Sequence, residues 1–159
     1  MASRTATGTE TGTRTRLEPW QAGFVGGVAG GVAFGAMMTI AMTPIIEMAI
    51  PGMYGLGPSL AIGWGIHMLN SIVLGIGFGL LVGATGLGDR LGANASIVGA
   101  GLVYGVVLWL VLASVVMPAW VGAMTEMAPS VPDWNGQSLL GHALYGAVLG
   151  LLYALLAKR

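Results

Sequence analysis

The sequence predicts an all-α membrane protein, with four transmembrane helices arranged as two parallel two-helix repeats in a compact, glycine-rich bundle. Three observations support this fold class. Only 8% of the 159 residues are charged, whereas ordinary soluble domains carry about 25%. The mean hydropathy is +0.83. Four uncharged runs reach or exceed the length of about 20 residues that crosses a bilayer. This composition disfavours a soluble enzyme, a nucleic-acid-binding protein and a disordered chain.

The first half of the chain contains a polar tail and two predicted helices. Residues 1–16 are rich in Thr, Gly and Ala, with scattered charge, and predict a disordered cytoplasmic tail ahead of a transmembrane domain at 17–159. An uncharged run then predicts a helix over about residues 20–46, which Glu47 and Pro51 bring to an end. The second helix, over about 58–87, opens at Pro58, because proline is favoured at a helix start.

The second half repeats this pattern of helix, loop and helix. The third predicted helix covers about residues 94–117 and closes near Pro118. A longer loop follows, in which Trp120 and Trp134 suit the headgroup layer. The fourth helix, about 137–157, ends at Lys158 and Arg159.

Basic residues indicate how these helices are oriented. All six Lys and Arg residues flank the same ends of the four helices, whereas the opposite loops carry only acids, Glu47, Glu126 and Asp133. The positive-inside rule therefore predicts a multi-pass protein of the cell membrane with both termini in the cytoplasm.

An internal repeat relates the two halves, at about residues 20–90 and 94–159. Displacing the sequence by 75 positions aligns the second helix with the fourth, and the matches include His67/His142, Leu74/Leu149 and Gly75/Gly150. The first and third helices align less well, at an offset of 74. Parallel repeats of this kind predict a pseudo-twofold axis along the membrane normal.

Glycines at every fourth position indicate how the helices pack. Small residues in this GxxxG spacing let backbones approach closely, because packing replaces the hydrophobic effect between helices in lipid. We therefore expect contacts, within the bundle or in a homo-oligomer, at Gly27, Gly31, Gly75, Gly79, Gly101, Gly105, Gly146 and Gly150.

His67 and His142 are the candidate cofactor-binding residues. Both lie inside uncharged spans at equivalent repeat positions, where an ionisable side chain is rare and costly. If both imidazoles face the axis, they suit the two axial positions of haem b, an arrangement that resembles small membrane b-type cytochromes. Hydrogen bonding to neighbouring helices is the alternative role. No arginine lies at this end of the spans to pair with haem propionates.

Methionine and glutamate suggest a second kind of site. Thioethers with imidazole suit Cu(I), and the candidate metal ligands are Met38, Met42 and Met68. Methionine also fills irregular apolar space without binding a metal. Glu47 and Glu126 occupy equivalent loop positions and either gather cations or are solvated loop charges.

The Thr-, Gly-, Arg- and Glu-containing tail and the Gly-, Ala- and Val-rich helices resemble small four-helix integral membrane proteins of halophilic archaea. We expect a non-catalytic accessory or assembly subunit, embedded in the lipid bilayer as a homo-oligomer or in a larger membrane complex. The alternatives are a b-type haem electron-transfer protein and a Met/His-lined metal or ion conduit. An enzyme is disfavoured, because the sequence has no HExxH motif, Walker loop or readable nucleophile and base.

Overall fold

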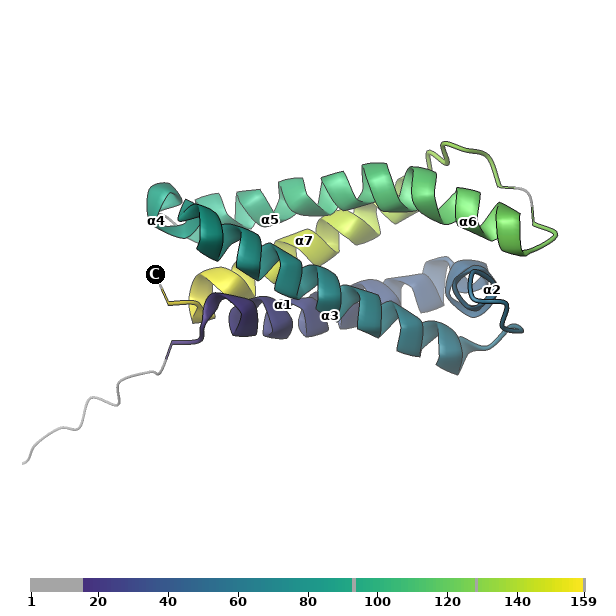
Figure 1. Ribbon diagram of the computed structural model, residues 1–159, viewed down its shortest axis with the longest axis horizontal. Helices are drawn as coiled ribbons and strands as arrows, with labels where there is room; N and C mark the ends of the chain where they lie inside the picture. Colours follow the sequence, from purple (N-terminus) through teal and green to yellow (C-terminus); the bar gives the residue numbers. More distant parts are fainter. Residues whose placement is uncertain (1–15, 93, 128, 159) are drawn as a thin grey trace, which may run out of the picture.

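The computed structural model describes residues 16–92, 94–127 and 129–158, and it shows an all-α bundle of four long apolar helices (Figure 1). The long helices α1 (Pro19–Ala41), α3 (Leu60–Thr85) and α7 (Gly136–Leu156) are each regular. The remaining long helix is continuous from Asn94 to Met124, and all four are long and apolar enough to cross a membrane. The predicted fold class is confirmed. The predicted tail at 1–16 lies outside the described residues, except for Arg16.

Polar side chains and glycine set the helix ends where the sequence changes character. At the start of α1, the Glu18 N–H donates to the Gln21 side chain at 3.0 Å. Ser59 caps α3 by accepting from the Ile62 N–H, and Asn135 caps α7 by accepting from the Ser138 N–H. Helix α3 ends at Gly86, whose φ of 62° suits a residue without a Cβ.

The first and third spans differ from the predicted boundaries. Helix α1 ends at Ala41, and two short helices follow, η1 (Ile45–Ala49) and α2 (Ile50–Gly52). The third span comprises α5 (Asn94–Leu108), the π-helix η2 (Trp109–Val116) and α6 (Met117–Met124), so it continues beyond Pro118. The wider π-helical turn precedes the proline and accommodates a residue that interrupts α-helical hydrogen bonding.

Glycine residues let the backbones of α1 and α3 come into direct contact. A Cβ on Gly27 would lie 2.6 Å from the Ser71 carbonyl oxygen and 3.1 Å from the Gly75 Cα. The neighbouring contacts involve the same two helices, with Gly31 against Ser71 and Gly79 against Pro19. These residues have no room for a larger side chain, which is the property expected of small residues at helix contacts in lipid.

The α5–α7 pair has contacts of the same kind. A Cβ on Gly101 would lie 2.8 Å from the Gly150 Cα, and Gly105 approaches the His142 carbonyl and Gly146. Gly27/Gly101 and Gly75/Gly150 are aligned pairs in the two proposed repeats. The repeat relation between the hairpins itself stays a prediction.

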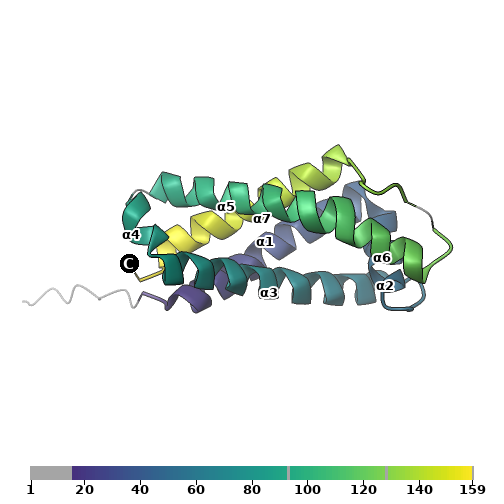
Figure 2. The ribbon, with the colours of Figure 1, turned by 45° about the horizontal axis from the view of Figure 1, so that its top comes forward.

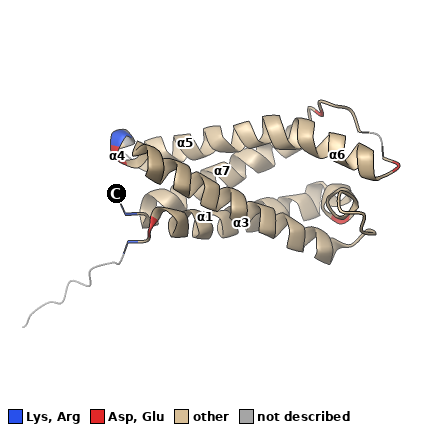
Figure 3. Ribbon diagram, viewed as in Figure 1, with Lys and Arg blue, Asp and Glu red and all other residues tan. Residues whose placement is uncertain are grey.

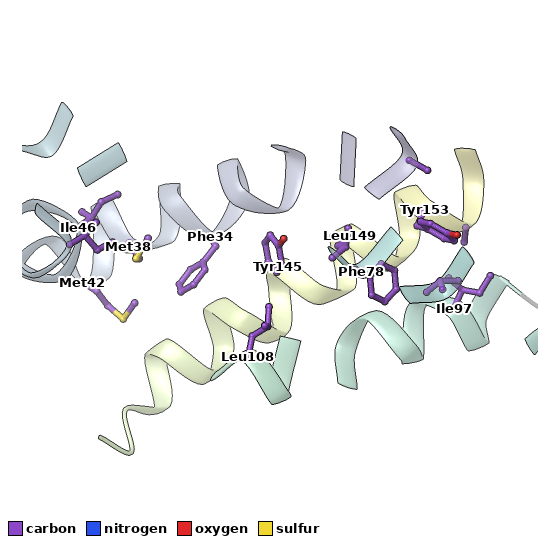
Figure 4. Packing of buried hydrophobic residues seen from close by; sticks show 14 of the residues in the cluster. Phe34, Met38, Met42, Ile46, Phe78, Ile97, Leu108, Tyr145, Leu149 and Tyr153 are labelled. Atoms are coloured by element: carbon purple, nitrogen blue, oxygen red, sulfur yellow. The ribbon is translucent and has the colours of Figure 1, made fainter. Parts of the chain in front are cut away.

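The two hairpins join along α1 and α7 and are further tied by two tyrosines. The Tyr145 hydroxyl donates to the Ser71 carbonyl at 2.6 Å, and the Tyr104 hydroxyl donates to the Leu74 carbonyl at 2.9 Å. Phe78 packs against Tyr104 and Tyr153, with ring centroids 5.2 and 5.5 Å apart. Figure 2 shows α1 and α7 next to each other, and Figure 4 shows buried side chains from several helices of the core.

The two ends of the bundle carry different charges (Figure 3). Among the described residues, the basic side chains Arg16, Arg90 and Lys158 lie at the end that holds the C-terminus and α4 (Leu87–Leu91). The opposite end carries only acidic charges, and we call it the acidic end. There the chain segments next to α2 and α6 contain Glu47, Glu126 and Asp133.

Candidate functional site

A cavity of about 590 Å³ lies toward the acidic end, between the two hairpins. Its walls come from α1, η1 and α2 in the first hairpin, and from η2, α6, the following loop and α7 in the second, with α3 on one side. Both histidines line it. The volume falls within the range of sites that bind small organic molecules, about 300–1,000 Å³.

The cavity wall is mostly apolar and rich in methionine. Phe34, Met38 and Met42 follow at four-residue spacing along one face of α1, and all three are buried and line the cavity (Figure 4). Other elements add Met53, Met117 and Met127. Flexible thioethers adapt to a ligand's shape and make favourable contacts with aromatic rings.

The three predicted metal-ligand methionines do not come together around this cavity. Met38 and Met42 line it, but Met68 is not among its lining residues. The Met68 sulfur instead lies beside α1, where a Cβ on Gly31 would be 3.2 Å from it. Within the part of the chain that the structure describes, no three His, Asp or Glu residues form a group that could hold a metal ion.

His67, on α3, is buried and hydrogen-bonded across to α1. Its Nε2 lies 2.9 Å from the Gly31 carbonyl oxygen, and the Ser71 hydroxyl lies 3.5 Å from the same nitrogen. Because a carbonyl oxygen only accepts hydrogen bonds, Nε2 carries the hydrogen. In the neutral ring, Nδ1 therefore carries the lone pair.

His142, on α7, uses its other ring nitrogen. Its Nδ1 lies 2.8 Å from the Ser138 carbonyl oxygen, one turn earlier in the same helix. That nitrogen carries the hydrogen for the same reason, so the lone pair of the neutral ring is on Nε2. The two histidines thus occupy equivalent positions in the sequence but have different hydrogen-bonding partners.

Phe34 contacts both histidine rings. Its ring centroid lies 5.5 Å from that of His67 and 4.8 Å from that of His142, and both pairs are edge-to-face. Gly141 makes room for it, because a Cβ there would overlap the Phe34 ring. Sequence analysis did not single out Phe34. Its only signal was a large aromatic residue within the glycine-rich stretch of α1.

A second, smaller space of about 70 Å³ adjoins the floor of the cavity, and we call it the recess. The cavity and the recess share Phe34, His67, Asn70, Leu74 and His142, and the recess is also lined by Ser71, Leu108 and Tyr145. The recess therefore places polar side chains at the inner end of an apolar cavity. Such a combination fixes the orientation of an otherwise apolar ligand.

One side of the cavity faces the lipid-exposed surface. Val73 on α3 and Val116 on η2 both line the cavity, and their side chains are 58% and 43% exposed. Asn70, one turn from Val73, is also exposed. The cavity lining is therefore exposed along α3 and η2, within two of the candidate spans, and also at Tyr54 and Trp120 near the acidic end.

The acidic residues contribute unequally to the site. Asp133 lines the cavity, whereas Glu47 and Glu126 are not among its lining residues. The Glu47 backbone carbonyl accepts from the Ser59 N–H at 2.8 Å and so helps to connect η1 with the start of α3. The described basic residues lie at the other end of the bundle (Figure 3).

Comparisons with family models, curated proteins and solved structures found no match to this chain. The fold and the site therefore define its class. It is a small α-helical membrane protein with four candidate spans and a cavity between its hairpins.

Proposed function

We propose that this chain is a non-catalytic accessory protein of the membrane that binds a neutral, largely apolar molecule taken from the bilayer. The cavity of about 590 Å³ between the hairpins, with two histidines at its inner end, carries this proposal. Its apolar walls suit a molecule that partitions into lipid. The exposed lining residues Val73 on α3 and Val116 on η2 support access from the bilayer.

Charge favours a neutral ligand. The described Lys and Arg residues lie at the far end of the bundle, and among the described residues Asp133 is the only charged side chain that lines the cavity. An anionic headgroup would therefore meet an acid and no described base. A ligand without net charge avoids this electrostatic repulsion.

Blocking the cavity tests the proposal. Ala113 on η2 lines the cavity, and Ala113→Trp would place an indole ring in it and occupy part of its volume. Ala119 on α6 is exposed and is not among the lining residues, so Ala119→Trp is the matched control. The proteins are purified from membranes in mild detergent, and neutral lipids are extracted and identified by mass spectrometry. We expect one neutral species in the wild type and in Ala119→Trp that Ala113→Trp lacks. The same set of bound neutral lipids in all three proteins would refute the proposal.

A b-type haem protein is the second candidate, and His142 favours it. Metal-ligating histidines commonly donate one ring N–H to a carbonyl, as His142 does to Ser138, so that the other nitrogen is oriented toward the metal. His67 fits less well, because its Nε2 is bonded to Gly31, and Phe34 contacts both rings. An absorption spectrum of the purified protein tests whether haem is bound. A Soret band and a sharp reduced α-band, lost in His67→Ala and His142→Ala, would establish haem. A colourless protein from haem-replete cells would exclude it, and metal analysis then tests for copper.

A further inference from the structure

The geometry points to a hydroxylated aromatic molecule of the hydroquinone class as the ligand, held in its reduced form by His67 and His142. This inference rests on the proposed function and names the chemical class that the same cavity would select. It follows from three features of the site: which ring nitrogens are free, how small the recess is, and which side chains surround it.

Both histidines offer an acceptor and no donor to a ligand while they are neutral. The N–H of each ring is already committed to a backbone carbonyl, Gly31 for His67 and Ser138 for His142. The remaining nitrogens, Nδ1 of His67 and Nε2 of His142, carry lone pairs and accept hydrogen bonds. A ligand that reaches them must therefore supply the hydrogens. A hydroquinone has two O–H donors, whereas the corresponding quinone has only acceptor oxygens.

The recess limits the size of the polar group. Its volume of about 70 Å³ admits hydroxyl groups or the edge of one ring, but not a large headgroup. The recess continues into the apolar cavity of about 590 Å³, which has room for the remaining rings or chain of a lipid-soluble molecule. A ligand with a small polar ring and an apolar body matches a small recess that continues into a larger apolar cavity.

The surroundings favour an aromatic ring over an aliphatic alcohol. Phe34 already makes edge-to-face contacts with both imidazoles, and Tyr145 lines the same recess. Met38 and Met42 lie four and eight residues after Phe34 and line the adjoining cavity, and sulfur–aromatic contacts are favourable. Aromatic rings thus line the recess together with both histidines, and thioethers line the adjoining cavity.

Three probes that share one ring system test the inference. They are 2-methyl-1,4-naphthohydroquinone, the corresponding quinone, and the dimethyl ether of the hydroquinone, which keeps the ring but has no O–H donor. Binding is measured anaerobically by equilibrium dialysis against the purified chain in nanodiscs, with empty nanodiscs as the blank. We expect the hydroquinone to bind at least about fivefold more tightly than either other probe, because a hydrogen bond contributes about 1 kcal/mol.

Variants assign the preference to the histidines. His67→Ala and His142→Ala should each reduce hydroquinone binding about fivefold and leave binding of the dimethyl ether unchanged. Met42→Leu should weaken all three probes alike, because Met42 lines the cavity. Met68→Leu is its control, because Met68 lies outside the cavity lining and should change none of them. Circular dichroism and gel filtration confirm that each variant is folded.

The outcomes separate this inference from the proposed function. If all three probes bind equally, or the quinone binds best, the hydroquinone inference is overturned while a binding cavity for neutral molecules stands. If no probe binds above the empty nanodiscs and no neutral species copurifies, the proposed function fails as well. If the preference persists in both histidine variants, the histidines do not select the ligand and the inference fails.

Discussion

The hydroxyl of Tyr145 donates a 2.6 Å hydrogen bond to the carbonyl oxygen of Ser71, and both residues are buried. This bond joins α7 of the second hairpin to α3 of the first, and Tyr145 also lines the recess. The same Ser71 carbonyl lies 2.6 Å from where a Cβ on Gly27 would be. One backbone group therefore connects three helices directly beneath the candidate site.

Tyr145→Phe should destabilise the bundle by about 1 kcal/mol, because it removes this hydrogen bond and keeps the ring. Unfolding in mixed micelles of mild detergent and SDS measures the difference. Tyr54→Phe is the control, because Tyr54 is 44% exposed and should be unaffected. A Tyr145→Phe protein as stable as the wild type would show that the bond does not hold the hairpins together.

Glycine contacts predict a pattern of alanine substitutions. Gly27→Ala and Gly101→Ala should each destabilise the fold by about 1–3 kcal/mol, because the added Cβ would meet backbone atoms of α3 or α7. In contrast, a Cβ on Gly65 in α3 would meet no atom within 4 Å. Gly65→Ala should therefore be neutral or stabilise by up to about 1 kcal/mol.

The same measurements test the sequence repeat. Gly27 and Gly101 are aligned positions, so their alanine variants should be destabilised by similar amounts. SDS-induced unfolding of all three variants gives the comparison. Loss of stability in Gly65→Ala, or none in Gly27→Ala, would contradict the packing account. A large difference between Gly27→Ala and Gly101→Ala would argue against equivalent hairpins.

Much of the fold was predictable from the pattern of hydrophobic and polar residues. Charges, prolines and glycines separate the four apolar runs, so the helices near 58–87 and 137–157 lie within a few residues of α3 and α7. The break after Ala41 was not predicted, because residues 20–46 carry no charge and the one marker there, Pro44, was not used to end the helix. The boundary expected at Pro118 failed because a π-helix precedes the proline and the helix continues to Met124.

The candidate site was predictable only in part. Sequence analysis singled out His67 and His142 because ionisable residues inside spans are rare. It could not show which ring nitrogen each histidine uses. His67 bonds through Nε2 to Gly31 on α1, whereas His142 bonds through Nδ1 to Ser138 on its own helix, and both choices depend on side-chain rotamers and helix contacts. Nor could sequence analysis place Phe34 against both rings, or Met127, Pro129 and Asp133 in the cavity wall, because these contacts join distant parts of the chain.

The charge difference between the two ends predicts the orientation in the membrane. All described basic residues lie at the end with the C-terminus, which the positive-inside rule places in the cytoplasm. The chain has no cysteine, so single substitutions provide clean labelling sites. In intact cells, an impermeant maleimide should label Glu126→Cys, and should label Arg90→Cys only after the cells are opened. The reverse pattern would invert the topology, and labelling of both would mean that the two loops share the outer side.

The carbonyl of Ser114 predicts how the loop over the cavity is held. In an α-helix this oxygen would accept from the residue four positions later, but that residue is Pro118, which has no N–H. The oxygen instead accepts from the Asp133 N–H at 2.8 Å. Ser114 lies in η2, and Asp133 lies in the loop that lines the cavity. In the α-helical register Pro118 has no hydrogen to give this acceptor, and the bond from Asp133 ties the loop to the span.

Pro118→Ala should loosen the loop without unfolding the bundle. The new N–H at residue 118 would compete for the Ser114 carbonyl, so the Asp133 amide should exchange its hydrogen several-fold faster. Exchange measured by NMR in nanodiscs tests this. Pro58→Ala is the control, because Pro58 is exposed and precedes α3 rather than lying within a span. Unchanged exchange at Asp133 would mean that the loop is held by its other contacts. Equally faster exchange in Pro58→Ala would attribute the effect to general destabilisation, not to competition for the Ser114 carbonyl.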